Sequence, residues 1–136
     1  MKTALFTKIL LTSNLLLAST AAFAWGPFPQ SNASVRVFNE SPLTIPAKLT
    51  KLNGTGIQNN PSSLPAGTPS TPSSANWYVT GYLGQYGEFN LTLGTGCIIH
   101  VKVGTVSITE NDDPHFNCTL KPNGPYQIND VNVTPK

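Results

Sequence analysis

Short segments in which apolar and polar side chains alternate are the feature that most constrains how this chain can fold. The clearest is segment 88–93, where Phe89, Leu91 and Leu93 alternate with polar residues. A period of two places apolar side chains on one face of a β-strand and polar side chains on the other. No segment after residue 24 shows a convincing apolar period of 3.6 residues. The pattern therefore predicts an all-β domain.

Several such segments follow one another at short spacing, separated by turns rich in Pro, Gly, Asn and Asp. This arrangement predicts an antiparallel β-sandwich of about seven or eight strands, with a flattened barrel as the alternative. The expected strands are residues 34–38, 43–52, 77–83, 86–93, 97–109, 116–120 and 126–133. The apolar parity changes between Val103 and Val106, which predicts a bulge or break at Gly104.

Two connections are also predicted. Residues 77–83 and 86–93 are expected to form one β-hairpin, with a turn at Gly84-Gln85 or at Gly84-Gln85-Tyr86. Residues 53–76 are rich in Pro, Ser, Thr and Gly. Such a composition buries too little apolar surface to order a chain, so this segment is predicted to be a long mobile loop within a single domain.

The first 24 residues have the organisation of a secretory signal peptide. Lys2 and Lys8 supply positive charge before the mostly apolar run of residues 9–18. Ala22-Phe23-Ala24 then fits the small-x-small pattern before a cleavage site. The apolar run is too short to span a bilayer as a helix. A buried N-terminal helix of the mature fold is the alternative. The sequence therefore predicts cleavage after Ala24, a mature domain of residues 25–136 without a transmembrane segment, and a secreted or periplasmic location.

The cysteines and charges narrow the class of protein further. Cys97 and Cys118 are the only two cysteines, and in an exported chain they are expected to form one disulfide. The chain has eight Lys and Arg against six Asp and Glu, and the excess lies entirely in Lys2 and Lys8. The mature chain is then formally neutral, which argues against nucleic acid as a partner.

No motif for catalysis or for a cofactor is apparent. His100 and His115 lie on polar faces of their strands and could form a weak metal site with Asp112 or Asp113, but most histidines at such positions are ordinary surface residues. The nucleophile motif G-x-S-x-G is absent, and the expected disulfide leaves no free thiol. The sequence therefore predicts a protein that is not an enzyme and that needs neither a cofactor nor a metal.

Aromatic residues gather around the predicted hairpin. In either turn register, one face of that hairpin combines aromatic rings with hydrogen-bonding side chains. Such a mixture suits a sugar ring, a lipid headgroup or a protein partner. The alternative is that the rings only cover the second sheet or the long loop. The candidate ligand-binding residues are Trp77, Tyr78, Tyr82, Tyr86, Glu88 and Asn90.

The order of several motifs resembles that of a known family. A Val-x-Val-Phe strand is followed by Asn39-x-Ser41, then by a long loop containing Leu64-Pro65-Ala66-Gly67, and later by Gly87-Glu88-Phe89-Asn90-Leu91. This layout resembles the aegerolysins, which are small β-sandwich proteins that recognise membrane lipids. The tryptophan-rich and acidic lipid-site features of that family are absent after Trp77. The resemblance therefore implies a fold class and transfers no functional residue.

Taken together, these features predict an exported, non-catalytic binding module for a surface glycan, a lipid headgroup or a protein partner. Two alternatives remain open at this point. A membrane-active protein like the aegerolysins would need an exposed apolar patch. A small secreted hydrolase would need a concave pocket that unites His100 or His115 with a carboxylate.

Overall fold

The computed structural model describes residues 31–122 and 130–136, which form strands and turns without a helix. The predicted signal peptide and the first part of the last expected strand lie outside the described residues. The strands are β1 (Ala33–Asn39), β2 (Ile45–Asn53), β3 (Gly56–Asn59), β4 (Ser63–Leu64), β5 (Ser73–Thr80), β6 (Glu88–Leu93), β7 (Cys97–Lys102), β8 (Thr105–Asn111), β9 (Phe116–Lys121) and β10 (Asp130–Pro135).

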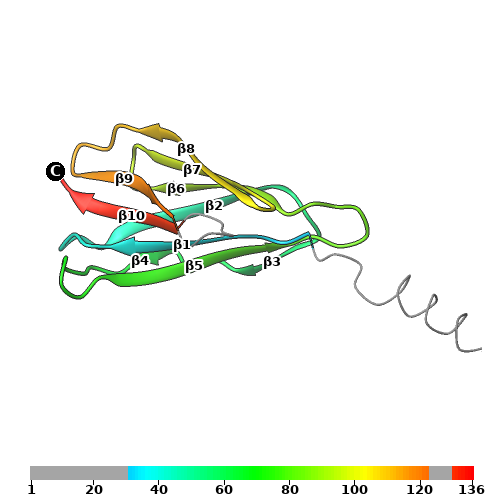
Figure 1. Cartoon of the computed structure of the whole chain (residues 1–136), viewed down its shortest axis with the longest axis horizontal. Helices are drawn as coiled ribbons and strands as arrows, with labels where there is room; N and C mark the ends of the chain where they lie inside the picture. The colour runs from blue at the N-terminus through cyan, green and yellow to red at the C-terminus, as the bar shows by residue number, and fades with distance from the viewer. Residues whose placement is uncertain (1–30, 123–129) are drawn as a thin grey trace, which may run out of the picture. The chain divides into compact units, whose positions relative to one another are not determined.

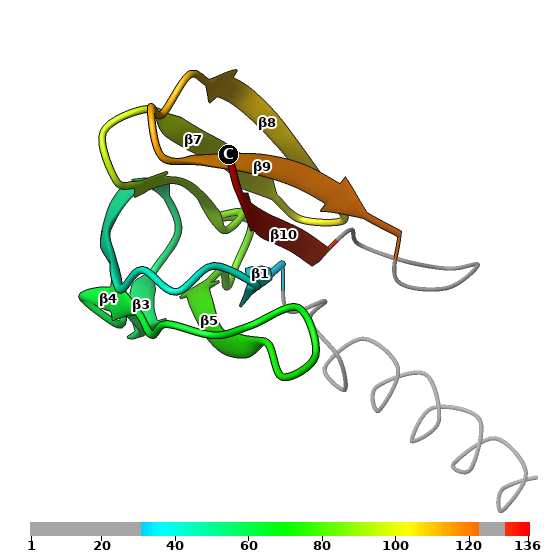
Figure 2. The ribbon, with the colours of Figure 1, turned by 90° about the vertical axis from the view of Figure 1, so that its left-hand side faces the viewer.

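These strands form two five-stranded sheets, one in the order β3-β5-β1-β10-β9 and the other in the order β4-β2-β6-β7-β8. In Figure 1 and Figure 2, β7 and β8 of one sheet lie on one side of the domain, and β1 and β5 of the other sheet lie on the opposite side. Among the described strands, β1 and β10 pair in parallel and the other pairs are antiparallel. The predicted all-β sandwich is confirmed.

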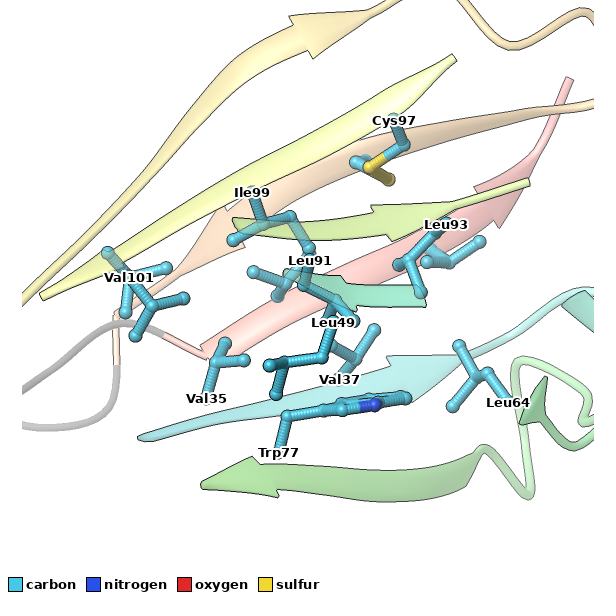
Figure 3. Packing of buried hydrophobic residues seen from close by; sticks show 14 of the residues in the cluster. Val35, Val37, Leu49, Leu64, Trp77, Leu91, Leu93, Cys97, Ile99 and Val101 are labelled. Atoms are coloured by element: carbon cyan, nitrogen blue, oxygen red, sulfur yellow. A yellow bond between two sulfur atoms is a disulfide. The ribbon is translucent and has the colours of Figure 1, made fainter. Parts of the chain in front are cut away.

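The core lies between the sheets because alternation in strands such as β1 and β6 directs their apolar side chains to the inner face. In β1 the buried apolar residues are Ala33, Val35 and Val37, and in β6 all three apolar positions are buried. Figure 3 shows side chains from both sheets meeting in this layer, with the Trp77 ring among them. Burying one such aliphatic side chain contributes roughly 1.5–3 kcal/mol, so the alternating strands supply most of the stabilising contacts.

The expected break at Gly104 is also present. β7 ends at Lys102 and β8 begins at Thr105, and Gly104 in the turn between them has a φ of 73°. That backbone conformation is favourable for glycine and costs energy for other residues. A register shift lies in the same strand pair, where Ile98 is opposite Glu110 and Ile99 is opposite Ile108.

The predicted hairpin of residues 77–83 with 86–93 is wrong. β5 pairs with β1 and β3 in one sheet, whereas β6 pairs with β2 and β7 in the other. Residues 81–87 therefore cross from one sheet to the other instead of forming a tight turn. This crossing lets Trp77 and Phe89 face each other's sheet across the core, where both are fully buried.

The segment 53–76 is not a loop throughout, because it contains β3, β4 and the first residues of β5. Leu64 is fully buried, and the indole Nε1 of Trp77 donates a hydrogen bond of 3.0 Å to the carbonyl of Pro61. The backbone N–H of Gly67 donates to the carbonyl of Ser41 at 2.8 Å. Bonds to distant parts of the chain thus order a segment whose own composition is poor in apolar residues.

The expected disulfide is present and links the two sheets. Cys97 at the start of β7 is bonded to Cys118 in β9, and both residues are buried. Beside it, the side-chain amide of Asn111 bonds the backbone of Cys118 twice: Nδ2 donates to the carbonyl at 3.0 Å, and Oδ1 accepts from the N–H at 2.9 Å. At this point of the β9 edge, the Asn111 side-chain amide therefore makes the two backbone hydrogen bonds that a neighbouring strand would otherwise make. A disulfide is compatible with an oxidising compartment.

Within the described part of the chain, no helix has the length and apolar character needed to span a membrane.

Candidate functional site

The turns of the sandwich gather at two opposite ends. One end, here called the exposed end, comprises turns 53–55, 81–87 and 103–104, because Asn53 and Lys102 both lie opposite Glu88 and Gly56 lies opposite Thr80. The other, here called the anchored end, comprises turns 40–44, 94–96 and 112–115. Figure 1 shows the loop after β5 projecting at the exposed end.

The predicted site residues separate into three locations. Trp77 is in the core with no exposed surface, so its inclusion in a ligand-binding face is wrong. Tyr78 lies on the outer face of the β5 sheet, opposite Ser34 of β1. The remaining four come together at or near the exposed end, in the 81–87 loop and on the outer face of β6: Tyr82, Tyr86, Glu88 and Asn90.

Two glycines fix the base of the 81–87 loop. A Cβ on Gly81 would lie 2.3 Å from the carbonyl oxygens of Gln85 and Ser31, and one on Gly87 would lie 2.6 Å from the N–H of Ala33. The backbone can therefore approach β1 only because these positions lack side chains. The N–H of Gly87 donates to the Ser31 carbonyl at 2.6 Å, which ties the loop to the start of β1.

The middle of this loop presents large apolar side chains to solvent. The exposed fractions are 48% for Tyr82, 66% for Leu83 and 60% for Tyr86. Leu83 also has a φ of 53°, a left-handed conformation that non-glycine residues rarely adopt. Strained backbone and exposed apolar residues both concentrate at binding surfaces, which makes this loop the first candidate for a contact with a partner molecule.

A groove of about 420 Å³ lies beside the loop. The ring of Tyr86 contributes its aromatic wall, and the neighbouring strands contribute polar groups from Asn53, Glu88 and Lys102. These three polar residues are brought together by strand register, since Asn53 of β2 and Lys102 of β7 are both paired with Glu88 of β6. The groove thus combines a ring, an amide, a carboxylate and an ammonium group.

The electrostatics of the groove are those of a balanced polar surface. The Glu88 carboxylate lies 3.6 Å from Nε2 of His100, and the two form an ion pair when the imidazole is protonated. Asn90 follows Glu88 by two residues on the same face and lies opposite His100 and Thr50. The side chains of Glu88 and His100 are both only partly exposed, because they lie against the sheet.

Sequence reasoning missed Asn53, Lys102 and Val103 as groove residues. Asn53-Gly54 was interpretable only as a turn signal, and Lys102 only as a residue on the polar side of its strand. Their proximity to Glu88 depends on which strands are neighbours and in what register. A local pattern holds no such information.

Within residues 31–122 and 130–136, no group of three or more His, Cys, Asp or Glu side chains is placed to bind a metal ion. The side chains that line the groove at the exposed end offer a ring for stacking, hydrogen-bonding groups and opposite charges.

Comparisons with protein-family models, with curated proteins and with solved structures find no match to this chain.

Proposed function

We propose that this protein is an exported, non-catalytic binding module that recognises a surface glycan in the groove at its exposed end. The observation that supports this proposal most directly is the combination of the exposed Tyr86 ring with Asn53, Glu88 and Lys102 in one open groove. A sugar ring offers a flat C–H surface for stacking and hydroxyl groups that hydrogen-bond to amides, carboxylates and ammonium groups. Tyrosine also supplies rigid, amphipathic contact area.

Export is part of the same proposal. The basic start, apolar run and Ala22-Phe23-Ala24 of the sequence fit a cleaved signal peptide, and a buried disulfide fits a secreted or periplasmic protein. N-terminal sequencing of the exported protein should then begin at Trp25. A protein that still begins at Met1 in the secreted or periplasmic fraction would contradict it.

A glycan screen tests the recognition. The exported protein should bind a subset of immobilised oligosaccharides, and Tyr86→Ala should weaken that binding by about 2 kcal/mol, or about thirtyfold, as for a central aromatic contact. Glu88→Gln should weaken it less, because only the charge of one hydrogen-bond acceptor is lost.

Tyr78→Ala is the matched control. It removes the same side chain from the outer face of the opposite sheet and should bind like the wild type. If Tyr86→Ala and Glu88→Gln also bind like the wild type, the groove is not the glycan site.

A membrane-active role, like that of the aegerolysins, is the second candidate. It is favoured by the aliphatic side chains at the exposed end, since Leu52 and Leu83 are exposed there and do not line the proposed glycan groove. Exposed apolar residues at loop tips can enter the boundary between lipid headgroups and acyl chains. In a vesicle co-flotation assay, Leu83→Ser should then reduce membrane binding while leaving glycan binding unchanged. Glycan binding without any vesicle binding would exclude this candidate.

A further inference from the structure

A second cleft, of about 310 Å³, lies at the anchored end, away from the proposed glycan groove. Its apolar walls come from the turn before β2, the start of β2 and the start of β9, and its polar groups come from three turns. Leu43, Pro46 and Phe116 line the apolar side of the cleft, and Thr44, Thr95 and His115 line its polar side. Its volume is at the lower end of the range for sites that bind small organic molecules.

Buried polar side chains fix one wall of this cleft. Asn39 has no exposed surface, and its Nδ2 donates to the carbonyls of Leu43 at 2.7 Å and Pro65 at 2.8 Å. Its Oδ1 accepts from the N–H of Ser41 at 2.9 Å, and the Ser41 hydroxyl accepts from the N–H of Leu43 at 3.3 Å. Leu43 and its neighbours are therefore held by a network that reaches into the Pro-rich segment.

The carboxylate of Asp113 fixes the opposite wall. Its Oδ2 accepts from the N–H of Thr95 at 2.9 Å and from the Thr95 hydroxyl at 3.2 Å, and its Oδ1 accepts from the N–H of His115 at 2.9 Å. Burial raises the pKa of this carboxyl, but the hydrogen bonds from His115 and Thr95 outweigh it, so the pKa lies below its ordinary value of 3.8. The negative charge stays at the base of the cleft at neutral pH.

This network leaves acceptors on the cleft side. The Thr95 hydroxyl uses its only proton on Asp113, so its oxygen can only accept from a ligand. Nδ1 of His115 faces Asp113 at 3.7 Å, and the imidazole is 72% exposed. In the neutral imidazole, a proton on Nδ1 beside the carboxylate leaves Nε2 as an acceptor.

Among the described residues that line the cleft, Asp113 carries a carboxylate and none is a Lys or Arg. Lys136 lies next to this wall, where its Nζ donates to the backbone carbonyl of Asp113 at 2.6 Å. The cleft lining therefore places a negative charge next to a set of hydrogen-bond acceptors. A cationic donor is the complementary ligand group.

We propose that the cleft at the anchored end is a binding site for a small organic cation, with an apolar body against Leu43, Pro46 and Phe116 and an ammonium group near Thr95 and His115. Each wall is fixed by buried hydrogen bonds before the ligand binds. Complex formation would therefore cost little conformational entropy. The site is separate from the proposed glycan groove and does not depend on it.

The arrangement favours binding over hydrolysis. The cleft unites His115 with a carboxylate, which a hydrolase would require, but its hydroxyl groups belong to Thr44 and Thr95. The Thr95 hydroxyl donates to Asp113 and not to the imidazole, so it is not positioned as an activated nucleophile.

The test is an NMR titration of the exported protein with 2-phenylethylamine, followed through backbone amide shifts. A probe of this size should bind at about millimolar concentration and should shift the amides of Thr44, Thr95 and His115. Phenylacetate has the same ring with the opposite charge and should cause no comparable shifts. 2-Phenylethanol, which is neutral, should bind more weakly than the amine.

Variants separate the two halves of the site. Thr95→Val removes one acceptor while keeping the N–H that bonds Asp113, and it should weaken amine binding about three- to tenfold. Leu43→Ala leaves the polar network intact and should weaken binding of both the amine and the alcohol. His100→Gln at the exposed end is the matched control and should have no effect.

Three results would overturn the proposal: no amide shifts at the anchored end, equal binding of phenylacetate and 2-phenylethylamine, or unchanged amine binding in both the Thr95→Val and Leu43→Ala variants.

Discussion

The two ends of the sandwich place their polar side chains differently. At the anchored end, Asn39 and Asp113 are buried and each makes three hydrogen bonds to other groups. At the exposed end, Glu88 and Lys102 face solvent or a groove, and the loop presents Tyr82, Leu83 and Tyr86. Buried, bonded polar groups stabilise a fold locally, whereas exposed groups are available to a partner. The contrast predicts that substitutions of the buried polar side chains at the anchored end change stability, and that substitutions of exposed side chains at the exposed end change binding.

The largest effect on stability should come from removing the disulfide next to the anchored end. Replacing Cys97 and Cys118 together with Ala should lower the free energy of unfolding by about 3 kcal/mol, since the bond closes a loop with a sequence separation of 21. Chemical denaturation followed by circular dichroism measures this change. An unfolding free energy equal to that of the wild type would show that the remaining contacts between the sheets are sufficient.

The next largest effect should follow Asp113→Asn. Losing the charge weakens the bonds from Thr95 and His115 and should cost about 2 kcal/mol at pH 7. Asp112→Asn, the exposed neighbour, is the control and should change stability by less than about 0.5 kcal/mol. Equal losses for the two variants would mean that the buried network does not distinguish the two carboxylates.

The cost of Asp113→Asn should also depend on pH. The folded protein holds the pKa of Asp113 below 3.8, so the charged carboxylate stabilises the fold above that pH. This contribution should disappear as the pH falls through the folded-state pKa. Urea unfolding of both proteins between pH 7 and pH 2 should therefore show the wild type losing its advantage only below about pH 4. An advantage that vanishes already at pH 6 would indicate a different titrating group.

A smaller loss is expected for Asn111→Ala. The variant removes the two bonds to the backbone of Cys118 and should cost about 1–2 kcal/mol. Amide exchange of Cys118 should become faster in the variant, while exchange in β6 should not change. Unchanged exchange at Cys118 would show that another group protects this part of the β9 edge.

The smallest effect is expected at the exposed end and has the opposite sign. Leu83→Gly removes a side chain from a residue with a φ of 53° and should raise stability by about 0.5 kcal/mol. Gln85→Gly in the same loop relieves no such strain and should lower stability slightly. Destabilisation by Leu83→Gly would mean that this exposed leucine packs against part of the protein, and would weaken the case for a binding loop.

The accuracy of the sequence-based predictions followed the range of the interactions. Alternation identified β1, β6 and β9 because the faces of a strand are set by residues two apart. The break at Gly104 was equally local. Whether β5 pairs with β6 depends on distant partners, and here it was predicted wrongly. The same holds for the residues that line the groove: Tyr86 and Glu88 are close in sequence and were among the candidate residues, whereas Asn53 and Lys102 join them through strand register.

The error at Trp77 has a related cause. Both faces of its strand carry aromatic residues, so the sequence does not show which face is buried. The opposite sheet and the hydrogen bond to Pro61 place Trp77 on the buried face. The Pro-rich segment shows the same dependence, since its hydrogen-bond partners include Asn39 at the end of β1 and Ser41 in the turn that follows.

The parallel pairing of β1 with β10 has a mechanical consequence. Because β1 begins at the exposed end and β10 runs beside it in the same direction, Ser31 and Lys136 lie toward opposite ends of the sandwich. A pulling force applied through these two residues would act along the β1–β10 ladder, so that its hydrogen bonds share the load instead of opening one after another. The Cys97–Cys118 bond would then limit how far the chain between those two residues could extend. The described domain should therefore resist extension along its length.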